Sequence, residues 1–170
     1  MNVSLNLTES IAMNNKRITV LLITALVCCI SVVAYGDTQN KVGRLSEDEF
    51  ESLMKGTNGR YLIVAMAAWC KPCRKELPIL DRLYKKYKDR GLRVVGISLD
   101  DSGPKAMQPI VDRLKVTFPV YWVSEDAIDD YDIYAVPLLF FIRDGEQVVK
   151  VVGQRSEKVL QEKIESFLED

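Results

Sequence analysis

The chain has 170 residues, of which 48% are hydrophobic and 28% charged, a composition that supports one globular domain with its own core. Its formal net charge of −1 favours neither nucleic acid nor an anionic membrane as a partner. The chain contains no histidine, which excludes Ser-His-Asp and Cys-His catalysis and also His-ligated zinc or haem. Its chemistry must therefore come from cysteine, carboxylate, lysine, tyrosine or backbone groups.

The first 36 residues are typical of a segment that directs export. Two basic residues, Lys16 and Arg17, precede an uncharged run over residues 18–33, which is followed by the small residues of Ala34-Tyr35-Gly36. We expect cleavage after this tripeptide, because the 16-residue run is shorter than the ~20 residues of a comfortable membrane-spanning helix. Retention as a membrane anchor is the alternative, and Met13 is an alternative start. Export would place the chain in the periplasm, where disulfides persist.

The four cysteines form two pairs of different character. Cys28 and Cys29 lie inside the apolar run, where we expect apolar filler; lipid attachment is the weaker alternative, because neither follows a small residue. Cys70 and Cys73 form the single C-x-x-C motif, so a four-cysteine zinc site cannot be closed, and the lack of a following His excludes haem attachment. Asp100-Asp101 has no third ligand nearby and is predicted to be a loop and cap. We therefore expect no metal and no cofactor.

The body of the chain alternates predicted strands and helices. A polar linker over residues 37–43 leads into these elements, which we list in chain order: a helix opened by the capping box Ser46–Glu49 and ending near Met54, a buried strand over 61–67, a helix over 72–89, a buried strand over 92–99, a helix from Pro104 to Lys115, an extended piece over 118–123, a helical turn over 125–131, hairpin strands over 138–142 and 147–152 around Asp144-Gly145, and a last helix from Ser156. This order predicts an α/β sandwich around a mixed sheet, because strand–helix–strand units pair in parallel and the hairpin adds antiparallel strands.

The place of Cys70, at a strand end and a helix start, favours redox chemistry. Its sulfur faces free backbone N–H groups and the positive end of the helix dipole, which stabilise the thiolate that attacks disulfides. Lys71 adds a neighbouring cation, and Pro72 suits the first helical turn. Cys73, one turn further on and less exposed, is expected to resolve the mixed disulfide. A static disulfide is the alternative, but a bridge over two residues contributes little stability.

A second motif, Val136-Pro137, precedes the predicted hairpin, where a cis proline is an option. Together with the run Trp69-Cys70-Lys71-Pro72-Cys73, it makes the chain resemble the thioredoxin superfamily from about Val42 to the C-terminus. The chain is similar in particular to the exported TlpA/ResA group. That finer likeness rests on the run over residues 69–78, on the segment over residues 100–131 and on the export signal.

This resemblance implies a thioredoxin-like three-layer α/β/α sandwich with a mixed central sheet, formed by residues 37–170 with an insert around residues 100–131. It also implies that Pro137 is cis and lies against the Cys70–Cys73 disulfide, and that the backbone around Val136 pairs with the substrate. We further expect substrate contacts from the residues around the nucleophile, which are Trp69, Lys71 and Pro72.

Glu76 lies three residues after Cys73, on the same face of the predicted helix. Ordinary thioredoxins use a buried Asp on the preceding strand as the proton acceptor, but the matching residue here is Val64, which cannot ionise. In the ResA group a Glu at the place of Glu76 does comparable work, so the resemblance implies that Glu76 takes the proton of Cys73. A partly buried carboxylate with a raised pKa suits this role. The alternative is that Glu76 only complements the helix dipole.

These features predict an exported thiol–disulfide oxidoreductase. We expect a reductase of protein disulfides, for example in cytochrome c maturation, that is itself reduced by a membrane thiol donor. Pro72 occupies a slot where a His can stabilise the thiolate, and its lack of a donor favours the reducing direction. A DsbA-like oxidant and a non-catalytic thioredoxin-fold binding module are the alternatives. A peroxidase is disfavoured, because Ala67 stands where peroxiredoxins place Thr or Ser.

Overall fold

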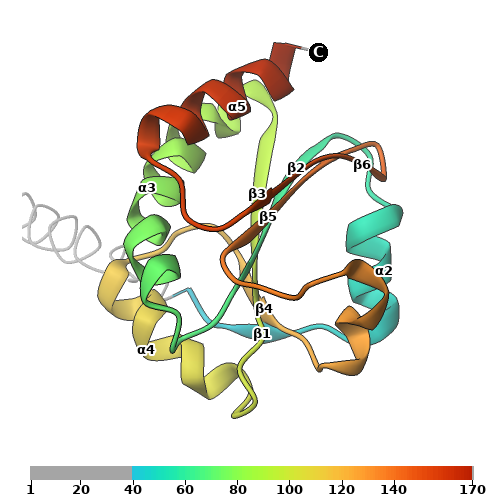
Figure 1. Cartoon of the computed structure of the whole chain (residues 1–170), viewed down its shortest axis with the longest axis vertical. Coiled ribbons are helices and arrows are strands. Elements are labelled where there is room, and N and C mark those ends of the chain that lie inside the picture. Colours follow the sequence, from blue (N-terminus) through green and yellow to red (C-terminus); the bar gives the residue numbers. More distant parts are fainter. Residues whose placement is uncertain (1–39, 170) are drawn as a thin grey trace, which may run out of the picture. The chain divides into compact units, whose positions relative to one another are not determined.

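Six strands form one mixed sheet in the computed structural model, which describes residues 40–169 (Figure 1). Their spatial order is β1 (Gly43–Arg44), β4 (Val120–Trp122), β3 (Leu92–Ser98), β2 (Arg60–Met66), β5 (Leu138–Arg143) and β6 (Glu146–Val152). The first four strands run parallel to one another, whereas β5 is antiparallel to both β2 and β6. The predicted mixed sheet is therefore confirmed.

Helices cover both faces of this sheet, which confirms the three-layer α/β/α sandwich. One face carries three helices, and the other carries a helix and a 3-10 helix. The first group consists of α3 (Lys71–Tyr87, continued by the 3-10 turn η1, Lys88–Arg90), α4 (Pro104–Leu114) and α5 (Glu157–Glu169); the second consists of α2 (Glu47–Lys55) and η2 (Asp126–Tyr131).

The central strand β2 is buried on both faces, as its continuous apolar run predicts. The side chains from Leu62 to Met66 are at most 1% exposed. Val64 lies between Gly96 of β3 and Leu139 of β5 in the strand register. A strand covered on both sides needs apolar residues at every position, because both faces meet packed side chains.

Local sequence signals define two of the element boundaries. Ser46 caps α2 by accepting a hydrogen bond from the backbone N–H of Glu49, whose carboxylate accepts one from the backbone N–H of Ser46 at 2.8 Å. The hairpin turn between β5 and β6 has positive φ at both Asp144 (50°) and Gly145 (82°). Two adjacent positive φ angles are characteristic of a type I′ turn, whose twist matches that of the flanking strands. The predicted capping box and the predicted hairpin turn are therefore both confirmed.

The structure corrects one prediction and does not test the predictions for the N-terminal segment. Gly43, predicted to end a linker, begins β1 and pairs in register with Tyr121 of β4. A two-residue strand has no periodicity from which it could be predicted. The export signal over residues 1–36, with Cys28, Cys29 and the alternative start at Met13, lies outside the described residues. Within residues 40–169, no helix has the length and apolar character needed to cross a membrane.

Candidate active site

Cys70 and Cys73 lie in the turn that joins β2 to α3 and in the first turn of α3. Cys70 is the N-cap residue of α3, and the backbone N–H of Cys73 donates to its Sγ over 3.1 Å. The two sulfurs form a disulfide, with their Cα atoms 5.3 Å apart. The predicted meeting of the Cys70 sulfur with a helix N–H is confirmed. Cys73 was predicted to be less exposed than Cys70, but the difference is small, because the exposed fractions are 3% for Cys70 and 2% for Cys73.

The turn before Cys70 is held at the peptide groups of Ala68. Both carboxylate oxygens of Asp100, just beyond β3, lie 3.0 Å from the backbone N–H of Ala68. The guanidinium of Arg74 donates to the carbonyl oxygen of the same residue. Asp100 is 4% exposed and also accepts a hydrogen bond from Ser98 Oγ at 2.7 Å. The carboxylate predicted to be a loop and cap therefore anchors the turn that presents the nucleophile.

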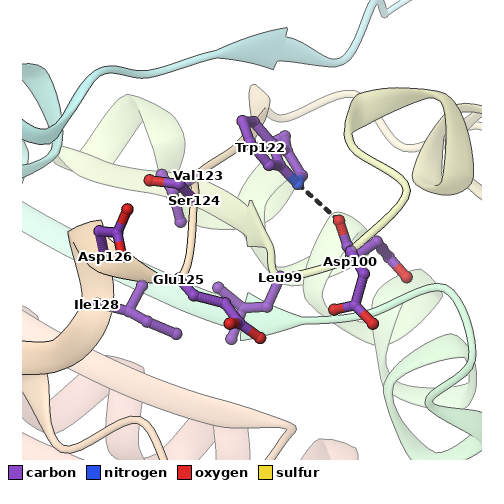
Figure 2. A pocket seen from close by; sticks show the side chains of 9 residues that line it. Leu99, Asp100, Trp122, Val123, Ser124, Glu125, Asp126 and Ile128 are labelled. Carbon is purple, nitrogen blue, oxygen red and sulfur yellow. Dashed lines mark hydrogen bonds between the residues drawn. The ribbon is translucent and has the colours of Figure 1, made fainter.

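Asp100 also lines a cavity of about 550 Å³ beyond the ends of β3 and β4 (Figure 2). The indole Nε1 of Trp122 donates to the main-chain oxygen of Asp100 over 2.7 Å and closes one side. Asp101, Glu125 and Asp126 add further carboxyl groups to the lining. Within the described part of the chain, no three Cys, Asp or Glu side chains converge in a way that could hold a metal ion.

Glu76 is fully buried one turn below the cysteines. Its side chain is 0% exposed, and its Oε1 accepts a hydrogen bond from the backbone N–H of Arg155 at 2.7 Å. Its Oε2 is buried and has no hydrogen-bond partner among the described residues. Burial raises the pKa of the Glu76 carboxyl, against the opposing effects of the Arg155 hydrogen bond and positive charge. A group with this pKa can bind and release a proton closer to neutral pH than an exposed Glu.

The Val136–Pro137 peptide bond is cis, as the resemblance implies. Leu138, the first residue of β5, pairs with Ala65 of β2. The cis proline therefore lies at the end of the sheet where β2 leads into the turn that carries Trp69 and Cys70, called the redox turn below. The carbonyl oxygen of Pro137 accepts a hydrogen bond from the backbone N–H of Gly153 at 2.7 Å. Pro137 is buried, and Val136 is half-buried against the core that contains both cysteines.

The other predicted site residues form an exposed rim. Trp69 is 69% exposed, and Lys71 and Pro72 are exposed beside it. Tyr134, three residues before the cis proline, is 74% exposed and was not predicted from the sequence. An aromatic residue just before a Val-Pro motif was the signal that could have drawn attention to it. Arg155 was missed for a different reason, since its contact with Glu76 spans 79 residues.

These features define the class: a thioredoxin-fold protein with a C-x-x-C disulfide at a helix start and a cis proline at the same sheet end, similar to proteins named thiol–disulfide oxidoreductases. Residues 40–151 match the AhpC/TSA family, and the chain belongs to that family.

Curated relatives support this class. A Bacillus cereus protein named thiol-disulfide oxidoreductase ResA is 33% identical over 95 residues, which cover 55% of this chain and 54% of that protein. In that alignment the chain spans about half the length of its relative. The Bacillus subtilis (strain 168) protein of the same name is 27% identical over 154 residues, which cover 82% of this chain and 86% of the relative.

Solved structures show the same fold. A Chlorobium tepidum protein assigned as thiol:disulfide interchange protein DsbE has a TM-score of 0.61 and 26% identity, and the match covers 66% of this chain and 82% of that one. StoA from Bacillus subtilis has a TM-score of 0.54 and 24% identity, with coverage of 62% and 83%.

Proposed function

We propose that the chain exchanges disulfides with protein substrates through Cys70 and Cys73. The observation that carries this proposal is the Cys70–Cys73 pair at the start of α3, where a helix N–H meets the Cys70 sulfur. In the reduced protein the Cys70 thiolate attacks a substrate disulfide, forms a mixed disulfide and releases one substrate thiolate. Cys73 then attacks the Cys70 sulfur, releases the second substrate thiol and re-forms the Cys70–Cys73 disulfide.

Glu76 is proposed to accept the proton that Cys73 loses in the second step. Val64, at the strand position where a thioredoxin Asp would lie, is apolar and 1% exposed, so β2 offers no acceptor there. Glu76 combines full burial, a raised pKa and an oxygen without a partner among the described residues. A carboxylate whose pKa lies closer to the working pH transfers protons more effectively than one with an ordinary pKa.

The substrate polypeptide is proposed to lie across the exposed rim and to pair with the backbone at Val136. Trp69, Lys71 and Pro72 are the exposed residues of the redox turn. Val136 and the cis Pro137 lie at the same end of the sheet, and Pro137 precedes β5, which pairs with β2. An extended peptide at this place would use main-chain hydrogen bonds for affinity and the rim for specificity.

The proposed direction is reduction, because Pro72 offers no hydrogen-bond donor to favour the thiolate form further. A membrane thiol donor would then return two electrons to the Cys70–Cys73 disulfide. The proposed setting is the periplasm, reached through the export signal or anchor over residues 1–36, with residues 37–170 as the redox domain and residues 100–131 as its insert. Cytochrome c maturation is the proposed process.

Three alternative functions make different experimental predictions. A DsbA-like oxidant would show an equilibrium with glutathione near the most oxidising potential known for this chemistry, about −120 mV. A non-catalytic binding module would keep its biological role without both thiols. A peroxidase would need a hydroxyl where Ala67 stands, and that residue is 0% exposed.

The decisive experiment traps the mixed disulfide in cells. A Cys73→Ser variant keeps the attacking thiol and loses the resolving one, so covalent adducts with substrate proteins should accumulate through Cys70. Non-reducing electrophoresis detects the adducts, and mass spectrometry identifies the trapped partner and hence the process.

The matched control is Cys70→Ser, which should trap no adduct. Adducts that form with Cys70→Ser but not with Cys73→Ser would reverse the assigned roles. A double Cys70→Ala, Cys73→Ala variant that restores a deletion strain would exclude a catalytic role.

A further inference from the structure

The connection between β6 and α5 joins two separate parts of the active site. The backbone N–H of Gly153 donates to the carbonyl oxygen of Pro137, and the backbone N–H of Arg155 donates to Glu76 Oε1, both over 2.7 Å. Gly153 has a φ of 80°, which L side chains rarely adopt, so the bend that aims both N–H groups inward favours glycine there. The connection therefore lies between the cis proline and the buried carboxyl.

The side chain of Arg155 stays at this connection. Its guanidinium donates to the carbonyl oxygens of Gly153 at 3.1 Å and Gln154 at 3.0 Å, and the residue is half-buried. These contacts hold a positive charge close to the loop that hydrogen-bonds Glu76. The backbone N–H of the same residue bonds Glu76 Oε1, so the guanidinium belongs to the loop that contacts the buried carboxyl.

Other charged side chains further along α3 are paired with neighbours on α3 and α5. On the same helix, Asp81 pairs with Lys85 at 2.6 Å. Between α3 and α5, Arg82 pairs with Glu157 through two hydrogen bonds of 3.2 and 2.7 Å. The charge of Arg155 lowers the pKa of the Glu76 carboxyl, against the effect of burial.

We propose that Arg155 is a positioning residue that stabilises the ionised form of Glu76 and so lowers the pH at which Cys73 becomes active. This inference rests on the proposed role of Glu76. The backbone N–H fixes Glu76 Oε1, whereas Oε2 has no partner among the residues described. The positive guanidinium offsets part of the free-energy cost that burial imposes on the ionised carboxylate. In the same sense, the Arg155 hydrogen bond and charge oppose the effect of burial on the pKa of Glu76.

The test compares two substitutions at Arg155 with a control. Arg155→Gln keeps a hydrogen-bond donor and removes the charge, whereas Arg155→Lys keeps the charge. The control, Lys158→Gln, removes an exposed cation at the second residue of α5. Among the ion pairs of the described residues, Lys158 pairs with Glu162 alone, at 3.9 Å. The pKa of Glu76 is read from the carboxyl ¹³C shift in the oxidised, ¹³C-Glu-labelled protein, with the signal assigned by its loss in Glu76→Gln.

We expect Arg155→Gln to raise the Glu76 midpoint by about 1 pH unit, in line with the effect of a nearby opposite charge. Arg155→Lys and Lys158→Gln should leave it near the wild-type value. In a Cys70→Ser background, the pH profile of Cys73 alkylation should move in the same direction with Arg155→Gln. Near-UV circular dichroism checks that each variant is folded.

Two outcomes separate the inference from the proposal beneath it. A Glu76 midpoint that stays in place in Arg155→Gln, or that moves equally in Arg155→Lys, overturns the role of the Arg155 charge alone. A Cys73 profile that does not change in Glu76→Gln overturns the role of Glu76, and the inference with it.

Discussion

Two buried carboxyls on α3 have opposite surroundings and therefore opposite properties. Asp81 accepts hydrogen bonds from Thr117 N and Oγ1, at 2.6 and 2.7 Å, and pairs with Lys85 at 2.6 Å. Burial alone would raise the pKa of Asp81, but the contacts with Lys85 and Thr117 outweigh it and hold the pKa below the usual range. Glu76 accepts a single N–H bond from the described residues, and its pKa is raised. The first carboxyl ties the structure together, and the second is suited to carry a proton.

At the residue scale, Asp81→Asn should lower the free energy of unfolding by about 1–2 kcal/mol at pH 7, because it removes charge-assisted hydrogen bonds. A carboxyl with a depressed folded pKa stabilises the protein above its unfolded pKa and loses that contribution as the pH falls through the folded pKa. The difference from wild type should therefore shrink as the pH falls below the ordinary range of Asp and vanish once the pH is below the folded pKa.

Urea unfolding of both proteins between about pH 2.5 and 8 measures this difference across the range in which carboxyl groups titrate. Asp89→Asn, at an exposed carboxyl on η1, is the matched control and should behave as wild type. A deficit that persists undiminished at the acid end would show that packing, rather than charge, accounts for the effect of Asp81.

At the element scale, the boundaries of α2 and of the β5–β6 hairpin follow from short sequence patterns. Ser46 and Glu49 interact within one helical turn, and Asp144-Gly145 defines its own turn, so both were predictable from neighbouring residues. Cys70, Cys73 and Glu76 were predictable for the same reason, because one helix presents all three.

What could not be predicted depends on contacts between distant segments. The hydrogen bond from Arg155 to Glu76 spans 79 residues, and the anchoring of Ala68 by Asp100 spans 32. Strand β1 forms because β4 lies beside it, since Gly43 and Arg44 carry no strand pattern of their own. Only the assembled domain determines these contacts.

Ser46→Ala tests the capping box of α2. Loss of a helix N-cap typically costs about 1 kcal/mol, because backbone N–H groups at the first turn lose their partner. We expect a decrease of that size in the free energy of unfolding by urea. Ser52→Ala, at an exposed position within the same helix, should leave stability unchanged or slightly higher. Equal losses in the two variants would contradict a capping role for Ser46.

At the scale of the whole molecule, one hydrophobic core joins the sheet to α3, the helix that carries Cys73. Phe167 of α5 is 3% exposed and packs edge-on against Phe141 of β5, with ring centroids 5.2 Å apart. Cys70, Cys73 and Leu77 belong to the same hydrophobic cluster. Loss of packing at α5 should therefore reduce the stability of the whole domain rather than of one end.

Phe167→Ala should lower the free energy of unfolding by about 3–5 kcal/mol, as expected for deletion of a buried aromatic ring. Far-UV circular dichroism and tryptophan fluorescence should still report one coincident transition. Ser166→Ala, at the exposed neighbouring position, should stay within ~0.5 kcal/mol of wild type. Separate transitions by the two probes would show that α5 unfolds independently.

The edges of the sheet bear on aggregation. Within residues 40–169 the sheet ends at β1, which is only two residues long, and at β6, where Glu146 and Lys150 flank the exposed Val148 and Val149. Short edges and flanking charges discourage one molecule from adding its strands to the next. Trp69, the exposed aromatic residue between β2 and α3, lies on neither edge strand, so the proposed substrate surface is separate from the edges at which other molecules could add their strands.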